Sequence, residues 1–94
     1  MEIPTIAGSA HPRLVRGVRL QTDATTGNGV LLFPEGVLEL NETARGIVTR
    51  CNGKTVAEIL QALAQEYDAD PGMLAADVQE TLVDLQRRNL IELT

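Results

Sequence analysis

The stretch from Leu31 to Asn41 reads Leu-Leu-Phe-Pro-Glu-Gly-Val-Leu-Glu-Leu-Asn. Two short apolar segments flank Pro-Glu-Gly, where proline presets φ and glycine can supply a positive φ, so the chain is expected to reverse there. Asn41 then offers a side-chain oxygen as a helix N-cap. The pattern predicts that Val37–Leu40 is an edge strand beside helices, with unpaired backbone groups that can accept another chain as an extra strand.

Two further strands are predicted before this one. Val18 and Leu20 alternate with polar residues, which is typical of a half-buried strand, and the Gly-rich segment 23–29 forms the following turn. Val30–Phe33 is apolar throughout, so either it is central with both faces covered or its outer face meets a partner, and we favour the partner. The result is a three-stranded antiparallel meander.

Three helices are predicted after the meander. The first runs from the Asn41 cap to Asn52-Gly53, the second starts with a capping box of Thr55 and Glu58, and the third starts at Asp70-Pro71 and runs to about Arg88. Each carries apolar residues at helical spacing, which in order are Ala44, Ile47, Val48 and Cys51; Val56, Ile59, Leu60, Leu63 and Tyr67; and Leu74, Val78, Leu82 and Leu85. Leu90–Leu93 is predicted to form a short last strand or to pack back on the helices.

The fold class predicted is therefore α+β and winged helix-turn-helix-like, with a three-stranded antiparallel sheet followed by three helices. Residues 12–94 make one domain, and residues 1–11, which mix Pro, Gly, Ser and Thr without a period, make a mobile tail that docks loosely or not at all.

Charge argues against nucleic acid as the partner. Residues 1–34 carry three bases and two acids (+1), whereas residues 35–94 carry five bases and eleven acids (−6). This larger part repels a phosphate backbone, and aromatic residues for base stacking are only 2% of the chain. A winged-helix regulator that binds DNA or another regulatory protein is the competing interpretation.

Catalysis, a metal site and a membrane span are not expected. The single Ser9 and the single His11 lie in the predicted tail, and Cys51 alone can form no intramolecular disulfide. Asp77 and Asp84 share one side of the third helix, where a solvated acidic face is a better interpretation than a catalytic pair. No cofactor is implied, and without a signal-like segment or a span of ~20 apolar residues we expect a cytoplasmic protein.

The chain resembles the PqqD family, the small peptide chaperones of pyrroloquinoline quinone (PQQ) biosynthesis, over about Pro12 to Leu93. The positions that carry the resemblance are Arg19-Leu20, Asp23, Leu31-Leu32, Pro34-Glu35-Gly36, Leu40-Asn41, Ala44, Ile47, Gly53, Thr55, Asp77-Val78, Leu82 and Leu85. The resemblance implies a winged-helix-like fold that binds the leader of the PqqA precursor peptide and presents it to the radical S-adenosylmethionine (SAM) enzyme PqqE. It also implies that the leader joins the third strand and packs on the third helix.

The edge strand and the third helix supply the candidate peptide-binding residues. We expect Val78, Leu82 and Leu85 to set the register of the peptide, and charged residues that include Arg87 to select polar groups. The full predicted set is Val37, Leu38, Glu39, Leu40, Asp77, Val78, Thr81, Leu82, Asp84, Leu85 and Arg88. Two alternatives stay open: the tail covers the edge, or a second copy does so in a homodimer, for which the apolar segment Val30–Phe33 offers a surface.

Overall fold

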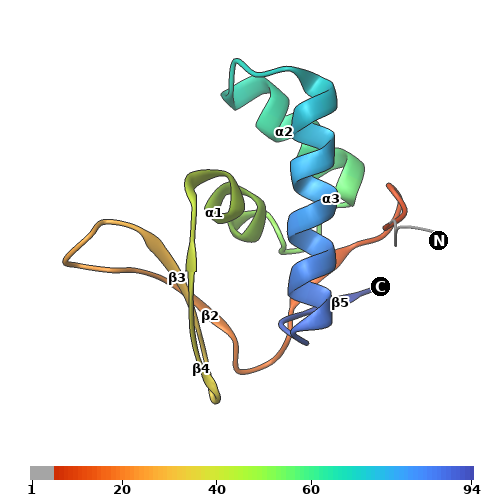
Figure 1. Ribbon diagram of the computed structural model, residues 1–94. Helices are drawn as coiled ribbons and strands as arrows, with labels where there is room; N and C mark the ends of the chain where they lie inside the picture. Colours follow the sequence, from red (N-terminus) through yellow and green to blue (C-terminus); the bar gives the residue numbers. More distant parts are fainter. Residues whose placement is uncertain (1–5) are drawn as a thin grey trace.

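The computed structural model describes residues 6–94 (Figure 1). Strands and helices follow one another as β1 (Pro12–Leu14), β2 (Arg19–Thr22), β3 (Gly29–Phe33), β4 (Gly36–Leu40), α1 (Glu42–Thr49), α2 (Val56–Glu66), α3 (Pro71–Arg87) and β5 (Ile91–Leu93). In Figure 1 the sheet that contains β4 stands at the left, α3 at the right, and α1 between them.

The predicted meander is confirmed. β2, β3 and β4 form an antiparallel sheet in that order, and β3 pairs with β4 from Phe33 opposite Gly36 to Gly29 opposite Leu40. Pro34 and Glu35 form the two-residue turn, after which Gly36 has a φ of 158°. Leu31 is fully buried on the inner face of the sheet. β4 is therefore an edge strand, and β3 is the central one.

A second, two-stranded sheet was not predicted as such. β1 pairs antiparallel with β5, with Pro12 opposite Leu93, and so joins the start of the domain to its end. The last strand was one of the two outcomes expected for Leu90–Leu93, but β1 was missed. Each strand has three residues, which is too short for an alternating pattern to show in the sequence.

The described part of the predicted tail is firmly docked, which corrects the expectation of a loose tail for residues 6–11. Ile6 is only 5% exposed, and the amide side chain of Gln79 on α3 both accepts from its N–H and donates to its carbonyl, each at 2.8 Å. The carbonyls of Gly8 and Ala10 accept from first-turn amides of α2, which have no partner within the helix. Residues 1–5 of the predicted tail lie outside the described residues.

Three side-chain caps set the helix starts. Asn41 accepts from the backbone N–H of Ala44, Asp70 accepts from that of Gly72, and Thr55 forms the predicted capping box with Glu58. All three N-terminal predictions are thus confirmed. α1 ends at Thr49, about one turn before the predicted end at Asn52-Gly53.

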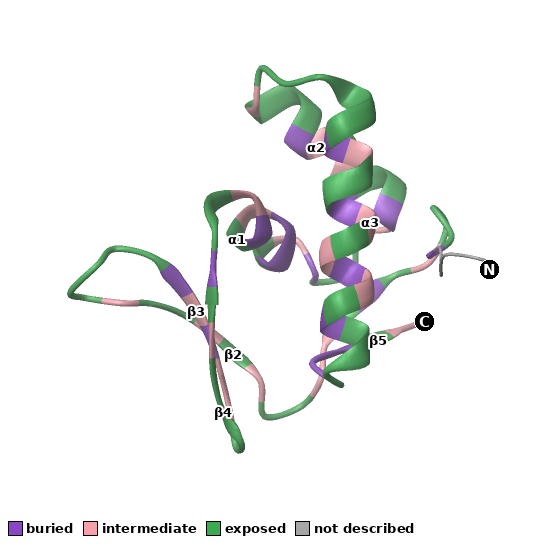
Figure 2. Cartoon of the chain, in the orientation of Figure 1, coloured by how far each residue is buried: buried purple, intermediate pink, exposed green. Residues whose placement is uncertain are grey.

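One core joins the sheet to the helices. Buried and exposed positions alternate along α3 (Figure 2), where the predicted apolar residues Leu74, Val78, Leu82 and Leu85 are all buried. Cys51 follows α1 and is buried as well; its thiol donates to the carbonyl of Ile47. Burial raises the pKa of the Cys51 thiol to about 11, so it stays protonated at neutral pH.

The capping box leads to a prediction about stability. Replacing Thr55 with alanine should cost about 1 kcal/mol in the free energy of unfolding at pH 7, because the N–H of Glu58 loses its partner. Urea titration measures this. A cost near zero would mean that the cap does not form.

The same box predicts a pH dependence. Hydrogen bonds from the backbone N–H and the side chain of Thr55 lower the pKa of Glu58, so its charged form stabilises the folded state. That contribution is present above the pKa of Glu58 in the unfolded chain and is lost as the pH falls through its lower value in the folded state. The Glu58→Gln variant keeps an acceptor without titrating, so its deficit in stability should shrink as the pH falls toward 3. A constant deficit would contradict the lowered pKa.

Candidate functional site

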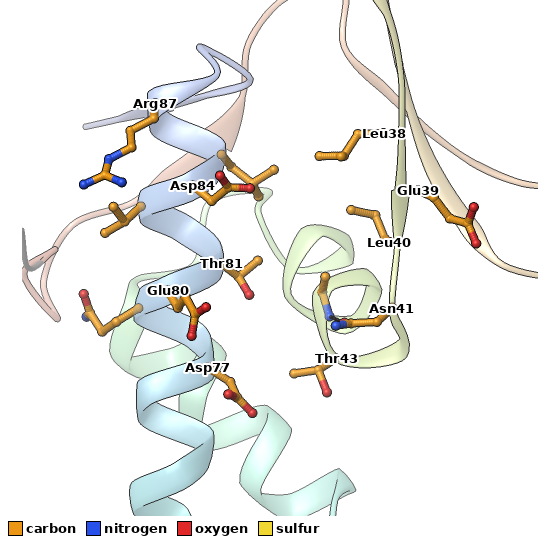
Figure 3. Close-up of a pocket in the computed structure, with 14 residues that line it drawn as sticks. Leu38, Glu39, Leu40, Asn41, Thr43, Asp77, Glu80, Thr81, Asp84 and Arg87 are labelled. Carbon is orange, nitrogen blue, oxygen red and sulfur yellow. Dashed lines mark hydrogen bonds between the residues drawn. The ribbon is translucent and has the colours of Figure 1, made fainter.

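A groove of about 720 Å³ separates β4 from α3 (Figure 3). Its volume lies within the range of about 300–1,000 Å³ that is usual for ligand sites. The start of α1 closes one end. Residues that line the groove are Leu38, Glu39, Leu40, Asn41, Thr43, Ala44, Asp77, Gln79, Glu80, Thr81, Val83, Asp84, Leu85 and Arg87.

The hydrogen bonds of the β2–β3 hairpin show how the ladder alternates. Asp23 donates its N–H to the carbonyl of Asn28, so the next pair, Thr22 and Gly29, is a pair without mutual hydrogen bonds. Gly29 therefore directs its N–H and C=O to the other side, toward β4, where it lies opposite Leu40.

The alternation then assigns the backbone groups of β4. Leu40 and Leu38 use their N–H and C=O on β3, whereas Val37 and Glu39 direct theirs away from the sheet. The β-turn of residues 33–36 agrees with this assignment. In such a turn the carbonyl of the first residue, Phe33, accepts from the N–H of the fourth, Gly36, so Gly36 also directs its N–H to β3. Val37 and Glu39 thus present two N–H and two C=O groups at the free edge.

Nothing in the described part of the chain covers this edge. β4 pairs only with β3 among the described strands, and no described residue outside the sheet is hydrogen-bonded to the backbone of Val37–Leu40. The alternative that the tail covers the edge fails for residues 6–11, which lie against α2 and α3 instead. The edge is available for an added strand.

The side chains of β4 divide between the two faces of the sheet. Leu38 and Leu40 point toward α3 (Figure 3) and, with Ala44 and Leu85, make the apolar floor of the groove. Glu39 points the other way and accepts a hydrogen bond from the side-chain amide of Asn28 at 2.9 Å. An added strand would therefore place every second side chain against the floor.

The wall opposite β4 is the polar face of α3. Asp77, Glu80, Thr81 and Asp84 recur at helical spacing along it. Asp84 pairs with Arg88 at 3.0 Å, whereas Asp77 and Glu80 form no ion pair with any described residue. This acidic wall would repel phosphate, so the structure gives no support to a DNA-binding role for α3.

Most of the predicted site residues come together around the groove. The predicted residues that line the groove are Leu38, Glu39, Leu40, Asp77, Thr81, Asp84 and Leu85.

The others are placed differently. Val78 and Leu82 are 1% and 0% exposed and do not line the groove, so the prediction that they contact the peptide is wrong. They lie in the core, where they pack α3 against the rest of the domain. Arg88 is the C-cap of α3 and pairs with Asp84, but Arg88 itself is not among the residues that line the groove. Val37 is 67% exposed and is not part of the lining.

Sequence reasoning missed several lining residues. Glu80 lies three residues after Asp77 and four before Asp84, so a helical projection of the predicted acidic face would have included it. No sequence signal indicated that the start of α1 and its cap also line the groove. The other missed residues are Asn41, Thr43, Ala44, Gln79 and Val83.

The open edge of β4 and the apolar floor beside it are suited to binding an extended chain, and no metal site accompanies them among the described residues. Among residues 6–94 no three His, Cys, Asp or Glu side chains are close enough to hold a metal ion. His11 lies away from the groove, where its ring Nδ1 is 2.9 Å from the carbonyl oxygen of Gly53. None of the described helices has the length and hydropathy needed to span a bilayer.

Fold and groove together define a winged-helix-like α+β domain with an open sheet edge beside its third helix. Two solved structures share this fold. One is the solution structure of the PqqD truncation of Methylobacterium extorquens PqqCD, described as a stand-alone recognition element for ribosomally synthesised and post-translationally modified peptides (TM-score 0.79, 40% identity, 92% of this chain and 93% of that one). The other is lasso peptide synthetase B1 complexed with the leader peptide (TM-score 0.73, 26% identity, 87% and 98%).

Sequence comparisons agree with the structural ones. The family model for coenzyme PQQ synthesis protein D matches residues 28–91. A PqqA binding protein of Xanthomonas oryzae pv. oryzae is 43% identical over 90 residues, which cover 95% of this chain and 98% of that protein. The chain belongs to the PqqD family. It is also 39% identical over 92 residues to the bifunctional coenzyme PQQ synthesis protein C/D of Methylorubrum extorquens, of which it spans only 25%.

Proposed function

We propose that this protein is a non-enzymatic adaptor of PQQ biosynthesis, which binds the PqqA precursor peptide by strand addition to β4 and presents it to the radical SAM enzyme PqqE. Family membership and the names of its relatives support the pathway and the peptide. The observation that supports binding by strand addition is the open edge of β4 beside the groove.

The outward backbone groups account for part of the affinity. The two N–H and two C=O groups of Val37 and Glu39 could each form one hydrogen bond worth roughly 0.5–1.5 kcal/mol net, or about 2–6 kcal/mol together. Association itself costs a comparable or larger amount, so backbone bonds alone give weak and unselective binding. Specificity must therefore come from side chains of the peptide against Leu38, Leu40 and the wall of α3.

Isothermal titration calorimetry tests the proposal. PqqA from the same genome should bind the protein with one peptide per groove, and a scrambled peptide of the same composition should bind at least tenfold more weakly. Equal affinities for the two peptides, or no binding of PqqA, would refute a specific peptide adaptor.

The role of PqqE belongs to the same proposal. Because the groove holds the peptide on one side of the domain, the remaining surface is free to meet an enzyme. We expect PqqE to co-sediment with the adaptor, and the adaptor alone to leave PqqA chemically unchanged by mass spectrometry. Any covalent change of PqqA by the purified adaptor would contradict its non-enzymatic role.

Two further parts of the proposal concern cell location and assembly. A cytoplasmic location agrees with the single buried thiol of Cys51, which needs no oxidising compartment. Homodimer formation stays a prediction. Its supporting observation is that Val30 and Leu32 are only half-buried on the outer face of β3, and light scattering measures the outcome.

A further inference from the structure

An N-terminal arm, which we define as residues 6–11, is attached to the middle of α3. Ile6 is 5% exposed and belongs to the core, although it precedes the first strand. The side chain of Gln79 accepts from the N–H of Ile6 and donates to its carbonyl, each at 2.8 Å. Two facing residues of an antiparallel sheet exchange hydrogen bonds in the same way, and here a side chain takes the part of one of them. The arm is therefore fixed to α3 by a specific polar contact as well as by burial.

The arm and β4 lie on opposite flanks of α3. Thr81 is directed toward β4 in Figure 3. Gln79 precedes Thr81 by two residues, which corresponds to about 200° around the helix axis, so its side chain leaves the other flank. Val78, which lies just before Gln79, faces the core. α3 thus has the core beneath it, the arm on one flank and the space that faces β4 on the other.

The arm supports the flank of α3 that a guest does not touch. α3 packs against α1, α2 and β5, whereas the groove separates it from β4. A peptide that enters between β4 and α3 pushes on the flank that carries Thr81, so the opposite flank needs a fixed support if the groove is to keep its width. The arm is itself held in place, because the carbonyls of Gly8 and Ala10 accept from the N–H groups of Ala57 and Val56 at the start of α2.

We propose that Ile6 and Gln79 are positioning residues for peptide binding: the docked arm braces α3 and keeps the groove at the width that fits the guest. Docking of the arm and binding of the peptide then favour each other. By linkage, the factor by which the docked arm tightens peptide binding equals the factor by which bound peptide tightens docking of the arm. This inference rests on the proposed function and adds to it the contribution of a segment that does not line the groove.

Amide hydrogen exchange on the unmodified protein tests this coupling. The N–H groups of Ile6 and Ala57 donate across the contact between the arm and the helices, and neither has a partner within a helix, so each exchanges when the arm undocks. Saturating PqqA should slow exchange at both amides by about fivefold, which is the lower end of the usual range of coupling. Unchanged exchange at both amides with PqqA bound would overturn the proposal.

Two variants measure the same factor through the affinity for PqqA. Ile6→Ala truncates a buried side chain that does not line the groove, so any loss of affinity must pass through α3, and the loss should match the factor found by exchange. Gln79→Leu removes both hydrogen bonds at a similar size and should have a similar effect. Its matched control, Gln86→Leu, makes the same change at an exposed position of α3 and should stay within about twofold of the wild type. Wild-type affinity in both Ile6→Ala and Gln79→Leu would overturn the proposal.

A further control separates positioning from a general loss of stability. Thr55→Ala destabilises the domain through the cap of α2, and it should keep its affinity for PqqA at a temperature where every variant is folded. If Thr55→Ala weakens binding as much as Ile6→Ala does, the loss of stability explains both effects and the proposal is overturned. If PqqA binds the wild type and no coupling to the arm is found, the brace is wrong while the proposed function stands. If PqqA itself fails to bind, both are overturned.

Discussion

Replacing Glu39 with proline is expected to weaken binding of the PqqA precursor by about 10- to 100-fold while the domain stays folded. The N–H of Glu39 points away from β3, so proline removes a donor from the free edge without breaking the β3–β4 ladder. The guest carbonyl would then be left unpaired against the proline ring, at a cost of about 1–3 kcal/mol. Calorimetry with PqqA measures the loss.

Two controls separate the backbone effect from other effects. Glu39→Ala removes the same side chain and its bond to Asn28 but keeps the N–H, so it should change the affinity by less than about threefold. Leu38→Pro removes an N–H that is bonded to β3 and should destabilise the sheet itself. Unchanged affinity in a folded Glu39→Pro variant would mean that the peptide does not use this edge.

Replacing Leu82 with alanine should lower the free energy of unfolding by about 2–5 kcal/mol, because a fully buried side chain is cut back and a cavity remains. This is a large part of the stability of a small domain. The neighbouring Thr81 lines the groove, so Thr81→Ala should weaken peptide binding and change stability by less than about 1 kcal/mol.

Urea titration and calorimetry on both variants give the comparison. The structure predicts that Leu82→Ala acts mainly on stability and Thr81→Ala mainly on binding. The reverse result, with a stable Leu82→Ala variant that no longer binds PqqA, would return Leu82 to the groove, where the sequence had placed it.

Local chemistry explains which parts of the fold could be predicted. Asn41, Thr55 and Asp70 act on backbone groups two or three residues away, so their capping roles are visible in the sequence. The turn at Pro34-Glu35 likewise depends on adjacent residues, and it fixes the register of β3 and β4, which decides which backbone groups of β4 face outward. The apolar and acidic flank of the third helix was the other surface that the sequence left open for a partner, and the family resemblance pointed to the same two surfaces.

Contacts between distant segments could not be predicted. Helical spacing shows that Val78, Leu82 and Leu85 share a stripe, but it cannot tell whether the core or a guest covers that stripe. The core covers all three, and only Leu85 also reaches the groove. The pairing of β1 with β5 and the hydrogen bonds of Ile6 with Gln79 join residues far apart in the chain, which no local pattern reports.

Amide hydrogen exchange by NMR tests the central claim most directly. In the free protein the amides of Val37 and Glu39 should exchange quickly, and those of Leu38 and Leu40 slowly, because only the second pair is bonded to β3. Saturating PqqA should slow exchange at Val37 and Glu39 and change the other two little. Slow exchange at Val37 and Glu39 without the peptide, or no change on its addition, would contradict strand addition at β4.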